Sequence, residues 1–348
     1  MESAGALTAA RPAIGLDARL TRQMSVGMKI YVRELTKRLP AVAPELTYVA
    51  FERGGNFGWD EQVRLPFSIA SSRVALTHYM SLYAPLLSPA PSVITVHDLI
   101  HLRYPEYFKS KVGPYYRTVV RYACARARRV ITDDEKTVED LIRYLHVDAA
   151  KVRVVPLGVD ERFFDPVTPY VAPSPYFLYV GNHRAHKNLR TLFDAWSRLP
   201  QRLAVDLYLT GPDDFDGALE RLRTPVRKIV ALGDVLPERL GPLYAGAVAL
   251  VQPALREGFG LPVLEAMASG CAVVATEGAL PHALSKAAVT FVDTDVEQLR
   301  VAMERFAVEP EYRARCAGEG RAAAAPLTWD RCARSTADVY EEALERPC

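Results

Sequence analysis

The chain has 348 residues, of which 49% are hydrophobic and 24% are charged, an ordinary composition for a globular protein with a sizeable core. This length predicts two α/β domains of roughly 150 residues each. The net charge of +2 creates no field that would require a nucleic acid as partner, and we expect none. The five cysteines lie far apart without a Cys-x-x-Cys pair, which argues against a disulfide framework or a zinc site.

The hydropathy of the chain limits its relation to membranes. No stretch approaches the ~20 apolar residues that a spanning helix needs. Residues 1–11 are small and polar and lack the apolar run of a signal peptide. We therefore expect a cytoplasmic protein whose membrane contact, if it has one, is peripheral and at the inner face.

Short apolar runs alternate with helical patterns along the whole chain, which predicts parallel sheets covered by helices on both faces. In the first half the expected strands are 13–17, 46–51, 92–96, 130–132 and 152–156. The expected helices there are 29–39, 115–129 and 138–145. Pro40 is expected to end the first of these helices, because proline lacks the N–H that a helix interior uses.

A proline-rich stretch divides the chain. Residues 165–175 hold four prolines, which excludes a helix or a central strand and predicts a linker. We therefore expect an N-terminal domain over 1–165, a C-terminal domain over 166–325, and a closing helix over 326–348 that could pack back on the first domain. In the second half the expected strands are 176–180, 205–210, 229–232, 248–252, 272–276 and 289–292, and the expected helices are 188–199, 236–246, 263–269 and 329–344.

The most informative stretch is REGFGLPVLEAMASG over residues 256–270, which follows a predicted strand, turns on two glycines and opens a helix. Gly258 and Gly260 lack a Cβ, so the backbone there can approach a ligand closely. The unpaired N–H groups at the helix start suit a phosphate. We expect Glu265, in the first helical turn, to accept hydrogen bonds from ribose hydroxyls and Glu257 to reach hydroxyls of a transferred sugar.

With its two glutamates eight residues apart, this stretch resembles the donor-site signature EGFGLPxLEAMAxGxPVV of the retaining glycosyltransferases of family 4. The resemblance covers nearly the whole chain and implies the GT-B fold, in which two Rossmann-like domains face each other across a cleft. It also implies that the C-terminal domain binds a nucleotide-sugar donor and the N-terminal domain an acceptor. Phe259 and Leu261 belong to the same signature and join the expected donor contacts.

Two further stretches resemble the same family. In YVGNHRAHKNL over 179–189, the family uses an arginine and a lysine to neutralise the donor diphosphate. This implies Lys187 as a catalytic phosphate contact and Arg184 as the nearest arginine. The apolar run 93–96 ends in His97 and Asp98, and similar enzymes place such a histidine beside the donor sugar. Asp98 is expected to orient His97 or the acceptor, although a purely structural histidine is the alternative.

Weaker resemblances complete the expected site. The loop 17–27 retains a glycine, Gly27, whose backbone N–H could meet the diphosphate, although a plain turn glycine is the alternative. The segment 232–236 stands where related enzymes hold the nucleotide base, which implies Asp234 and Val235. Two Asp-x-Asp triplets, 214–216 and 293–295, lie in polar loops away from these motifs, so we expect them to be structural and expect no metal and no further cofactor.

The segment from Arg103 to Arg129 carries eight basic residues and one acidic residue, with aromatic residues between them. Such a surface can lie against anionic headgroups, which would suit a lipid-linked acceptor. A solvated helix face is the alternative interpretation.

The resemblance implies a retaining reaction, and no carboxylate is placed as an obvious nucleophile, so we expect front-face displacement. The residues from His97 to Ile100 with Arg103-Tyr104-Pro105 resemble bacterial mannosyltransferases of polysaccharide assembly. They favour GDP-mannose as donor, with UDP-hexose or dTDP-rhamnose next, and a glycan or lipid-linked acceptor. A GT-B epimerase of nucleotide sugars and a non-catalytic scaffold that binds membrane or partners remain the alternatives.

Overall fold

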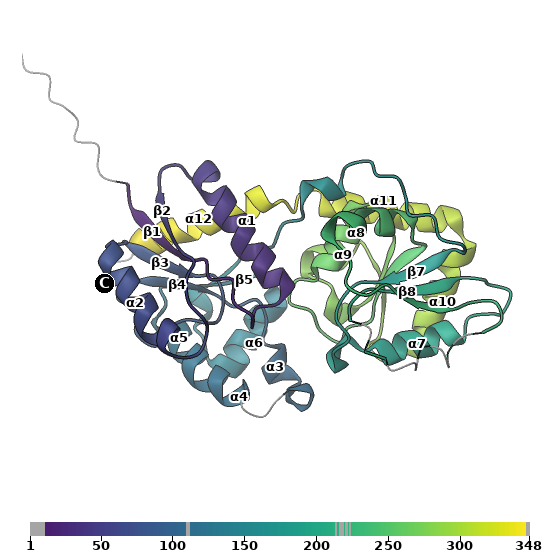
Figure 1. The fold of residues 1–348 in the computed structure, drawn as a ribbon, viewed down its shortest axis with the longest axis horizontal. Coiled ribbons are helices and arrows are strands. Elements are labelled where there is room, and N and C mark those ends of the chain that lie inside the picture. The colour runs from purple at the N-terminus through teal and green to yellow at the C-terminus, as the bar shows by residue number, and fades with distance from the viewer. Residues whose placement is uncertain are drawn as a thin grey trace, which may run out of the picture.

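The computed structural model describes residues 11–108, 112–212, 214–215, 219, 222 and 224–345. Their strands form two six-stranded sheets, one in each half of the chain, and helices cover both sheets (Figure 1). The first sheet has the strand order β2-β1-β3-β4-β5-β6 and the second the order β12-β11-β10-β7-β8-β9. All neighbouring strands run parallel, so the carboxyl ends of each sheet's strands meet at one edge.

The first half follows the predicted alternation of strands and helices. Its strands are β1 (Ala13–Asp17), β2 (Thr47–Phe51), β3 (Leu76–Tyr79), β4 (Ser92–Thr95), β5 (Arg129–Thr132) and β6 (Val152–Val154). Its helices are α1 (Val26–Val42), α2 (Leu65–Ser72), α3 (Ile100–Arg103), α4 (Val112–Tyr115), α5 (Arg121–Arg126) and α6 (Glu135–Leu145). Two π-helical turns, η1 (Asp60–Arg64) and η3 (Tyr116–Val120), lead directly into α2 and α5.

This half differs from the prediction in several places. Helices α2 and α3 were not predicted, and the helix expected over 115–129 ends at Arg126, because Arg129 already begins β5. Helix α1 runs past Pro40 to Val42, because the proline lies in the last turn while the earlier turns bury an apolar face that includes Leu35. Strand β3 was not predicted at all. It is buried along its whole length but carries a histidine, His78, whose two ring nitrogens lie 2.7 Å from the hydroxyls of Tyr340 and Thr95. These hydrogen bonds permit a polar residue in a central strand, where an apolar run is the usual signal.

The second half repeats the same architecture. Its strands are β7 (Tyr176–Tyr179), β8 (Asp206–Leu209), β9 (Ile229–Ala231), β10 (Ala249–Gln252), β11 (Val273–Thr276) and β12 (Val289–Phe291). Its helices are α7 (Leu189–Ser197), α8 (Pro237–Gly246), α9 (Leu261–Ala268), α10 (Val296–Val308), α11 (Pro310–Ala324) and α12 (Trp329–Glu345). Helices α10 and α11 were not predicted. α11 buries only Gly320 and Ala324, so its sequence carries almost no amphipathic pattern.

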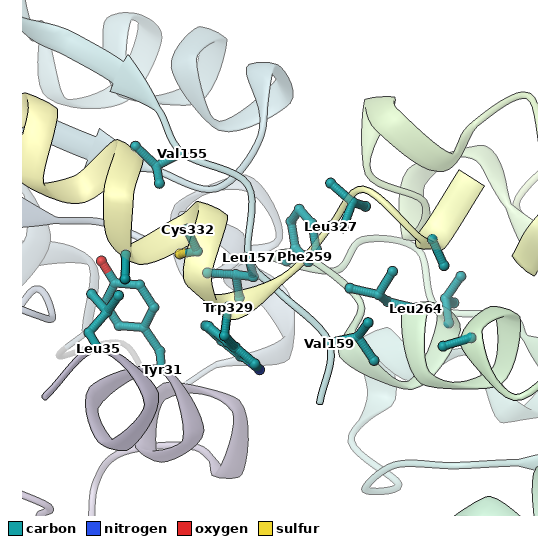
Figure 2. Close-up of a cluster of buried hydrophobic side chains, with 14 of the residues drawn as sticks. Tyr31, Leu35, Val155, Leu157, Val159, Phe259, Leu264, Leu327, Trp329 and Cys332 are labelled. Atoms are coloured by element: carbon teal, nitrogen blue, oxygen red, sulfur yellow. The ribbon is translucent and has the colours of Figure 1, made fainter. Parts of the chain in front are cut away.

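The chain crosses between the two halves twice, and the two crossings touch. Val159 donates its backbone N–H to the carbonyl of Leu327 at 3.0 Å. Gly158 lies so close to the backbone of Trp329 that no Cβ fits between them. Figure 2 shows side chains of both crossings beside Phe259 of the second half, within one buried apolar cluster. Helix α12 then packs on α1, so the end of the chain lies in the first half.

In the part of the chain that the structure describes, no helix combines the length and the apolar character that crossing a bilayer requires.

Candidate active site

An acidic and a basic side chain meet at the carboxyl edge of the second sheet. β7 and β10 are neighbouring strands, so the loops that follow them lie side by side. Lys187 follows β7 and Glu257 follows β10, and the Lys187 ammonium lies 2.5 Å from Oε1 of Glu257. Each side chain is only 12% exposed. A lysine has three N–H donors, so two remain for a ligand in the position where open α/β sheets bind ligands.

The loop that carries Glu257 also touches the first half of the chain. A Cβ built on Gly258 would lie 3.4 Å from Oδ2 of Asp98 and 3.5 Å from the carbonyl of His97. Gly260 has φ +74°, the left-handed conformation that favours glycine, and forms the N-cap of α9. Gly27 lies at the same helix start, because its Cβ would lie 3.5 Å from the Leu261 side chain. The structure thus brings Gly27, His97 and the glycine-rich loop together.

His97 is held by a residue that the sequence did not indicate. Its Nδ1 lies 2.7 Å from Oδ2 of Asp133, at the carboxyl end of β5, and the edge of Tyr31 packs on its ring at 4.7 Å. Asp98, expected to orient His97 or the acceptor, makes no hydrogen bond to His97 among the described residues, and its Oδ1 accepts the backbone N–H of Ile100 at 3.0 Å. Burial alone would lower the pKa of His97, but the charge and hydrogen bond of Asp133 raise it above the usual value.

Glu265 lies in the second turn of α9 rather than the first, because the helix already begins at Leu261. Its Oε2 accepts a hydrogen bond from the hydroxyl of Tyr244 at 2.9 Å. Burial raises the pKa of Glu265 to about 7, although the Tyr244 hydrogen bond opposes that shift. Glu265 therefore holds its proton more tightly than an exposed glutamate does.

The other residues that were expected to contact the donor differ from one another in exposure and location. Arg184 is exposed and lies near Tyr83 and His101 of the first half. Burial raises the pKa of Tyr83 and lowers that of His101, and the charge of Arg184 opposes the first shift and adds to the second. Phe259 is only 4% exposed and its side chain lies in the apolar junction, so only its backbone is available to a ligand. Asp234 is exposed after the edge strand β9, which β8 separates from β7 and its Lys187 loop.

Val235, the second expected contact of the base, is half-buried and packs against the large apolar cluster. His186, the residue directly before Lys187, is 5% exposed, and its ring lies 5.5 Å from that of Phe108. Burial and the neighbouring cations lower the pKa of His186 to about 4, so it is neutral at pH 7. The positive charge in this loop therefore comes from Lys187 and Arg184.

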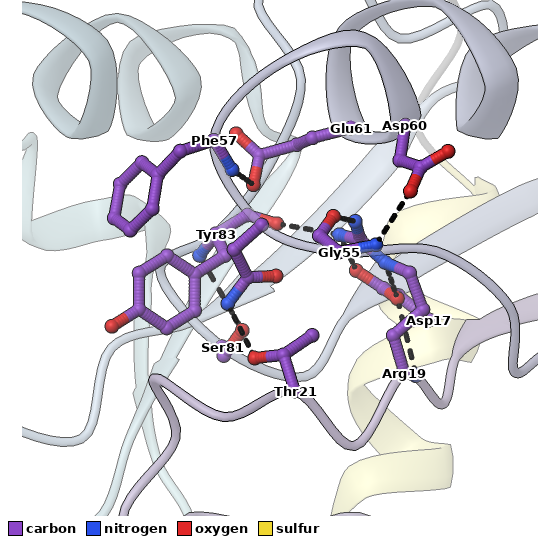
Figure 3. Close-up of polar contacts among 10 residues, drawn as sticks. Asp17, Arg19, Thr21, Gly55, Phe57, Asp60, Glu61, Ser81 and Tyr83 are labelled. Atoms are coloured by element: carbon purple, nitrogen blue, oxygen red, sulfur yellow. Dashed lines mark hydrogen bonds and ion pairs between the residues drawn. The ribbon is translucent and has the colours of Figure 1, made fainter.

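A polar cluster in the first half was not found from the sequence (Figure 3). Asp17, at the end of β1, binds Arg19 through two hydrogen bonds of 2.7 and 2.8 Å. Arg19 also donates to the carbonyls of Gly55 at 2.7 Å and Tyr83 at 3.1 Å. The carboxylate of Glu61 accepts the N–H of Phe57 at 3.2 Å. The only sequence signal was an acid and an arginine directly after a strand, which is too common a pattern to be specific.

One described aspartate of each Asp-x-Asp triplet has a partner within the chain. Asp295 caps the N-terminus of α10 by accepting the backbone N–H groups of Glu297 and Gln298. Asp214 lies 2.6 Å from Nδ1 of His183, and Asp216 lies outside the described residues.

Comparison with known proteins defines the class. A model of glycosyl transferases group 1 matches residues 174–308, and a model of glycosyltransferase family 4 matches residues 47–163. The chain belongs to these glycosyltransferases and is an enzyme of that class. HepE of Anabaena, solved in complex with UDP and glucose, superposes with a TM-score of 0.71 at 15% identity, covering 95% of this chain and 100% of its own. This likeness shows that the fold is GT-B, as predicted.

Several relatives bear the names of mannosyltransferases. O-antigen chain mannosyltransferase B of Escherichia coli is 28% identical over 267 residues, which cover 72% of this chain and 70% of the relative. O-antigen chain mannosyltransferase RfbU of Salmonella typhimurium is 29% identical over 250 residues, which cover 67% of each chain.

Proposed function

We propose that this enzyme transfers a hexose, with mannose favoured, from a nucleotide-diphosphate sugar to a glycan or lipid-linked acceptor. One observation carries the proposal: the Lys187–Glu257 pair lies at the carboxyl edge of the second sheet, and the next residue, Gly258, lies against His97 and Asp98 of the first half. Two relatives named as O-antigen mannosyltransferases favour mannose. A neighbour of the same fold solved with UDP and glucose supports a nucleotide-linked donor.

The donor diphosphate would be bound without a metal ion. Lys187 supplies up to two free N–H donors, and the start of α9 supplies backbone N–H groups with a partial positive charge. Gly27 lies at the same helix start and can add its backbone N–H. Arg184 is exposed nearby and forms no ion pair among the described residues. Together these groups would stabilise the negative charge that develops on the leaving diphosphate.

The reaction would retain the configuration of the sugar by front-face displacement. The acceptor hydroxyl oxygen forms a bond to the anomeric carbon while the bond from that carbon to the diphosphate oxygen breaks. The proton of the acceptor hydroxyl passes to the departing diphosphate. Glu257 would hold sugar hydroxyls, and His97, fixed by Asp133, would lie on the other side of the sugar.

The acceptor would bind in the first half, beside the polar cluster of Figure 3. Tyr83 lies between the two sides. Its ring packs on Phe57 at 5.2 Å, and burial raises the pKa of its hydroxyl, a rise to which the charges of Glu61 and Asp98 add and which that of Arg184 opposes. The buried Asp17–Arg19 ion pair holds the backbone on which Tyr83 lies. A sugar acceptor would find both stacking and hydrogen-bonding partners here.

We also propose that the first half contacts an anionic membrane, which would bring a lipid-linked acceptor to the site. Trp59 and Phe67 are 74% and 73% exposed, and Leu87 is 70% exposed. Trp59, Val63 and Phe67 are spaced four residues apart along η1 and α2, so they share one helical face. The loop that carries Leu87 is joined to η1, because the backbone N–H of Leu86 donates to Oε1 of Gln62 at 2.9 Å. Leu86 also lines a small pocket with Arg126 of α5.

Arg126, which lines the pocket beside Leu86, is exposed, and so are Arg117 and Arg121 in the same segment from Arg103 to Arg129. Cosedimentation with phosphatidylglycerol vesicles tests the contact, and phosphatidylcholine vesicles serve as control. We expect Trp59→Ser with Phe67→Ser to lower binding to the anionic vesicles about tenfold, whereas Val171→Ser, 87% exposed in the linker, leaves it unchanged. Equal binding to both lipids, or no effect of the double variant, contradicts the contact.

Nucleotide release tests the function itself. The purified enzyme is incubated with GDP-mannose, UDP-glucose or dTDP-rhamnose, with and without a panel of mannosides and polyprenyl-linked sugars. We expect release of the nucleoside diphosphate that depends on acceptor, strongest with GDP-mannose. Conversion of a donor without acceptor indicates an epimerase, and the absence of any turnover with any pair indicates a scaffold. Either of these two results would overturn the proposal.

A further inference from the structure

Helix α6 belongs to the first half but makes polar contacts to the second half along its first turns. Asp134, its N-cap, accepts the backbone N–H of His282 at 2.6 Å. Lys136 donates to the carbonyls of Glu277 and Leu280 at 2.5 and 2.6 Å. The residue before the cap is Asp133, which holds His97. The start of α6 therefore connects the histidine of the first half to loops of the second.

One turn further on, a buried carboxylate on the same helix reaches the glycine-rich loop. Asp140 is 2% exposed and accepts hydrogen bonds from Arg103 at 3.0 Å and from Arg256 at 3.1 Å. Arg256 is itself only 8% exposed and directly precedes Glu257 in the chain. A buried carboxylate is stable only when it is paired, so this contact holds Arg256 at a fixed place relative to α6.

The backbone on both sides of Arg256 is held by contacts, so it has little freedom to move when the Arg256 side chain is displaced. Leu255 donates its N–H to the carbonyl of His186 at 2.9 Å, and Glu257 donates its N–H to the carbonyl of Gly278 at 3.4 Å. Gly278 packs directly against the carbonyl of Leu255. A displacement of the Arg256 side chain would therefore be transmitted to Glu257, its neighbour in a tight loop.

From these contacts we infer that Asp140, acting through Arg256, is a positioning residue for Glu257. The inference rests on the proposed function, because it assigns a role within the same reaction. Asp140 touches no substrate in this account. It fixes the distance between α6, which begins beside the His97–Asp133 pair, and the loop that presents Glu257 to the sugar. One helix thereby fixes the position of Glu257 relative to His97.

The experiment compares Asp140→Asn and Arg256→Gln with the wild type in the acceptor-dependent transfer assay. Asparagine matches the shape of aspartate but removes its charge. We expect each variant to lower kcat about tenfold and to change the donor KM less than about twofold, because a misplaced Glu257 fails mainly in the transition state. If Asp140→Asn does not fold, Arg256→Gln alone tests the positioning role, because it breaks the same contact from the second half.

A second measurement separates positioning from a merely structural role. If Arg256 acts only through Glu257, adding Arg256→Gln to Glu257→Ala changes kcat by less than about twofold. Glu342→Gln is the matched control, because Glu342 also joins two arginines, Arg129 at 2.9 Å and Arg153 at 2.9 Å, but within the first half and α12. We expect this control to lower the thermal midpoint without lowering kcat.

The outcomes are distinct for the two proposals. If the wild type transfers no sugar in any donor–acceptor pair, the proposed function fails. If the wild type is active while Asp140→Asn and Arg256→Gln retain its kcat, the positioning role is wrong. It is also wrong if Arg256→Gln lowers kcat as strongly without the Glu257 carboxylate as with it.

Discussion

The two halves of the reaction centre are built in different ways. In the second half, Glu257, the glycine turn and Glu265 come from one continuous stretch, and Lys187 comes from the loop of the neighbouring strand. In the first half, the polar groups come from separate segments that meet only in the folded chain. The difference indicates that the proposed donor side follows from local sequence, whereas the proposed acceptor side follows from tertiary packing.

The largest effect is expected on the donor side. Lys187→Ala and Glu257→Ala each remove one member of a buried pair that we propose faces the donor, and we expect transfer to fall about a hundredfold or more. Steady-state kinetics with circular dichroism checks that the variants fold. The control is Arg190→Ala, because its side chain on α7 is 94% exposed. Near-normal turnover in either variant would break the assignment.

The junction between the halves should be sensitive to a single methyl group. In Gly158→Ala, the new Cβ meets the backbone of Trp329 and Thr328, which cannot give way without moving the second crossing. We expect the free energy of unfolding to fall by about 3 kcal/mol, measured by urea denaturation. Gly318→Ala on α11 is the control, because Gly318 is exposed and no atom outside its own helix lies within 4 Å of its Cβ position. This control should keep or raise the free energy of unfolding, because alanine favours a helix interior over glycine. If Gly158→Ala also leaves the free energy of unfolding unchanged or raises it, the packing is contradicted.

Short-range patterns predicted most of the alternating strands and helices, including a helix that opens after the glycines of residues 256–270. The GT-B fold was predicted from the family resemblance. The sequence did not predict β3, since His78 interrupts the apolar run and is satisfied by Tyr340, which is 262 residues away. For the same reason Asp133 was missed as the partner of His97. Its role depends on the neighbouring positions of β4 and β5 in the sheet, which no local pattern reveals.

An intermediate effect on kcat is expected when the partner of His97 is changed. Asp133→Asn removes the charge that raises the pKa of His97, so that pKa should fall. In the wild type, the stability that the raised pKa contributes is full below the usual histidine pKa and is lost as pH rises through the folded value. NMR titration of the His97 ring measures the shift, and we expect kcat to fall about tenfold with it. An unchanged pKa would show that Asp133 does not control His97.

The smallest effect is a pH dependence of the second half. The pKa of Glu265 is raised to about 7, so the folded state holds this proton more tightly than the unfolded chain. The contribution of this group to the free energy of unfolding therefore falls as pH rises from the usual glutamate pKa to about 7. We expect the thermal midpoint of the wild type to fall relative to Glu265→Gln over that window. Parallel midpoints at all pH values would show that Glu265 titrates normally.

The central claim is that Lys187 and Glu257 of the second half and His97 of the first half act on one sugar diphosphate. A crystal structure with GDP-mannose or another turned-over donor tests it most directly. We predict that the diphosphate lies within hydrogen-bonding distance of Lys187 Nζ and that the sugar lies between Glu257 and His97. A donor bound elsewhere, with these three side chains making no contact to it, would contradict the account.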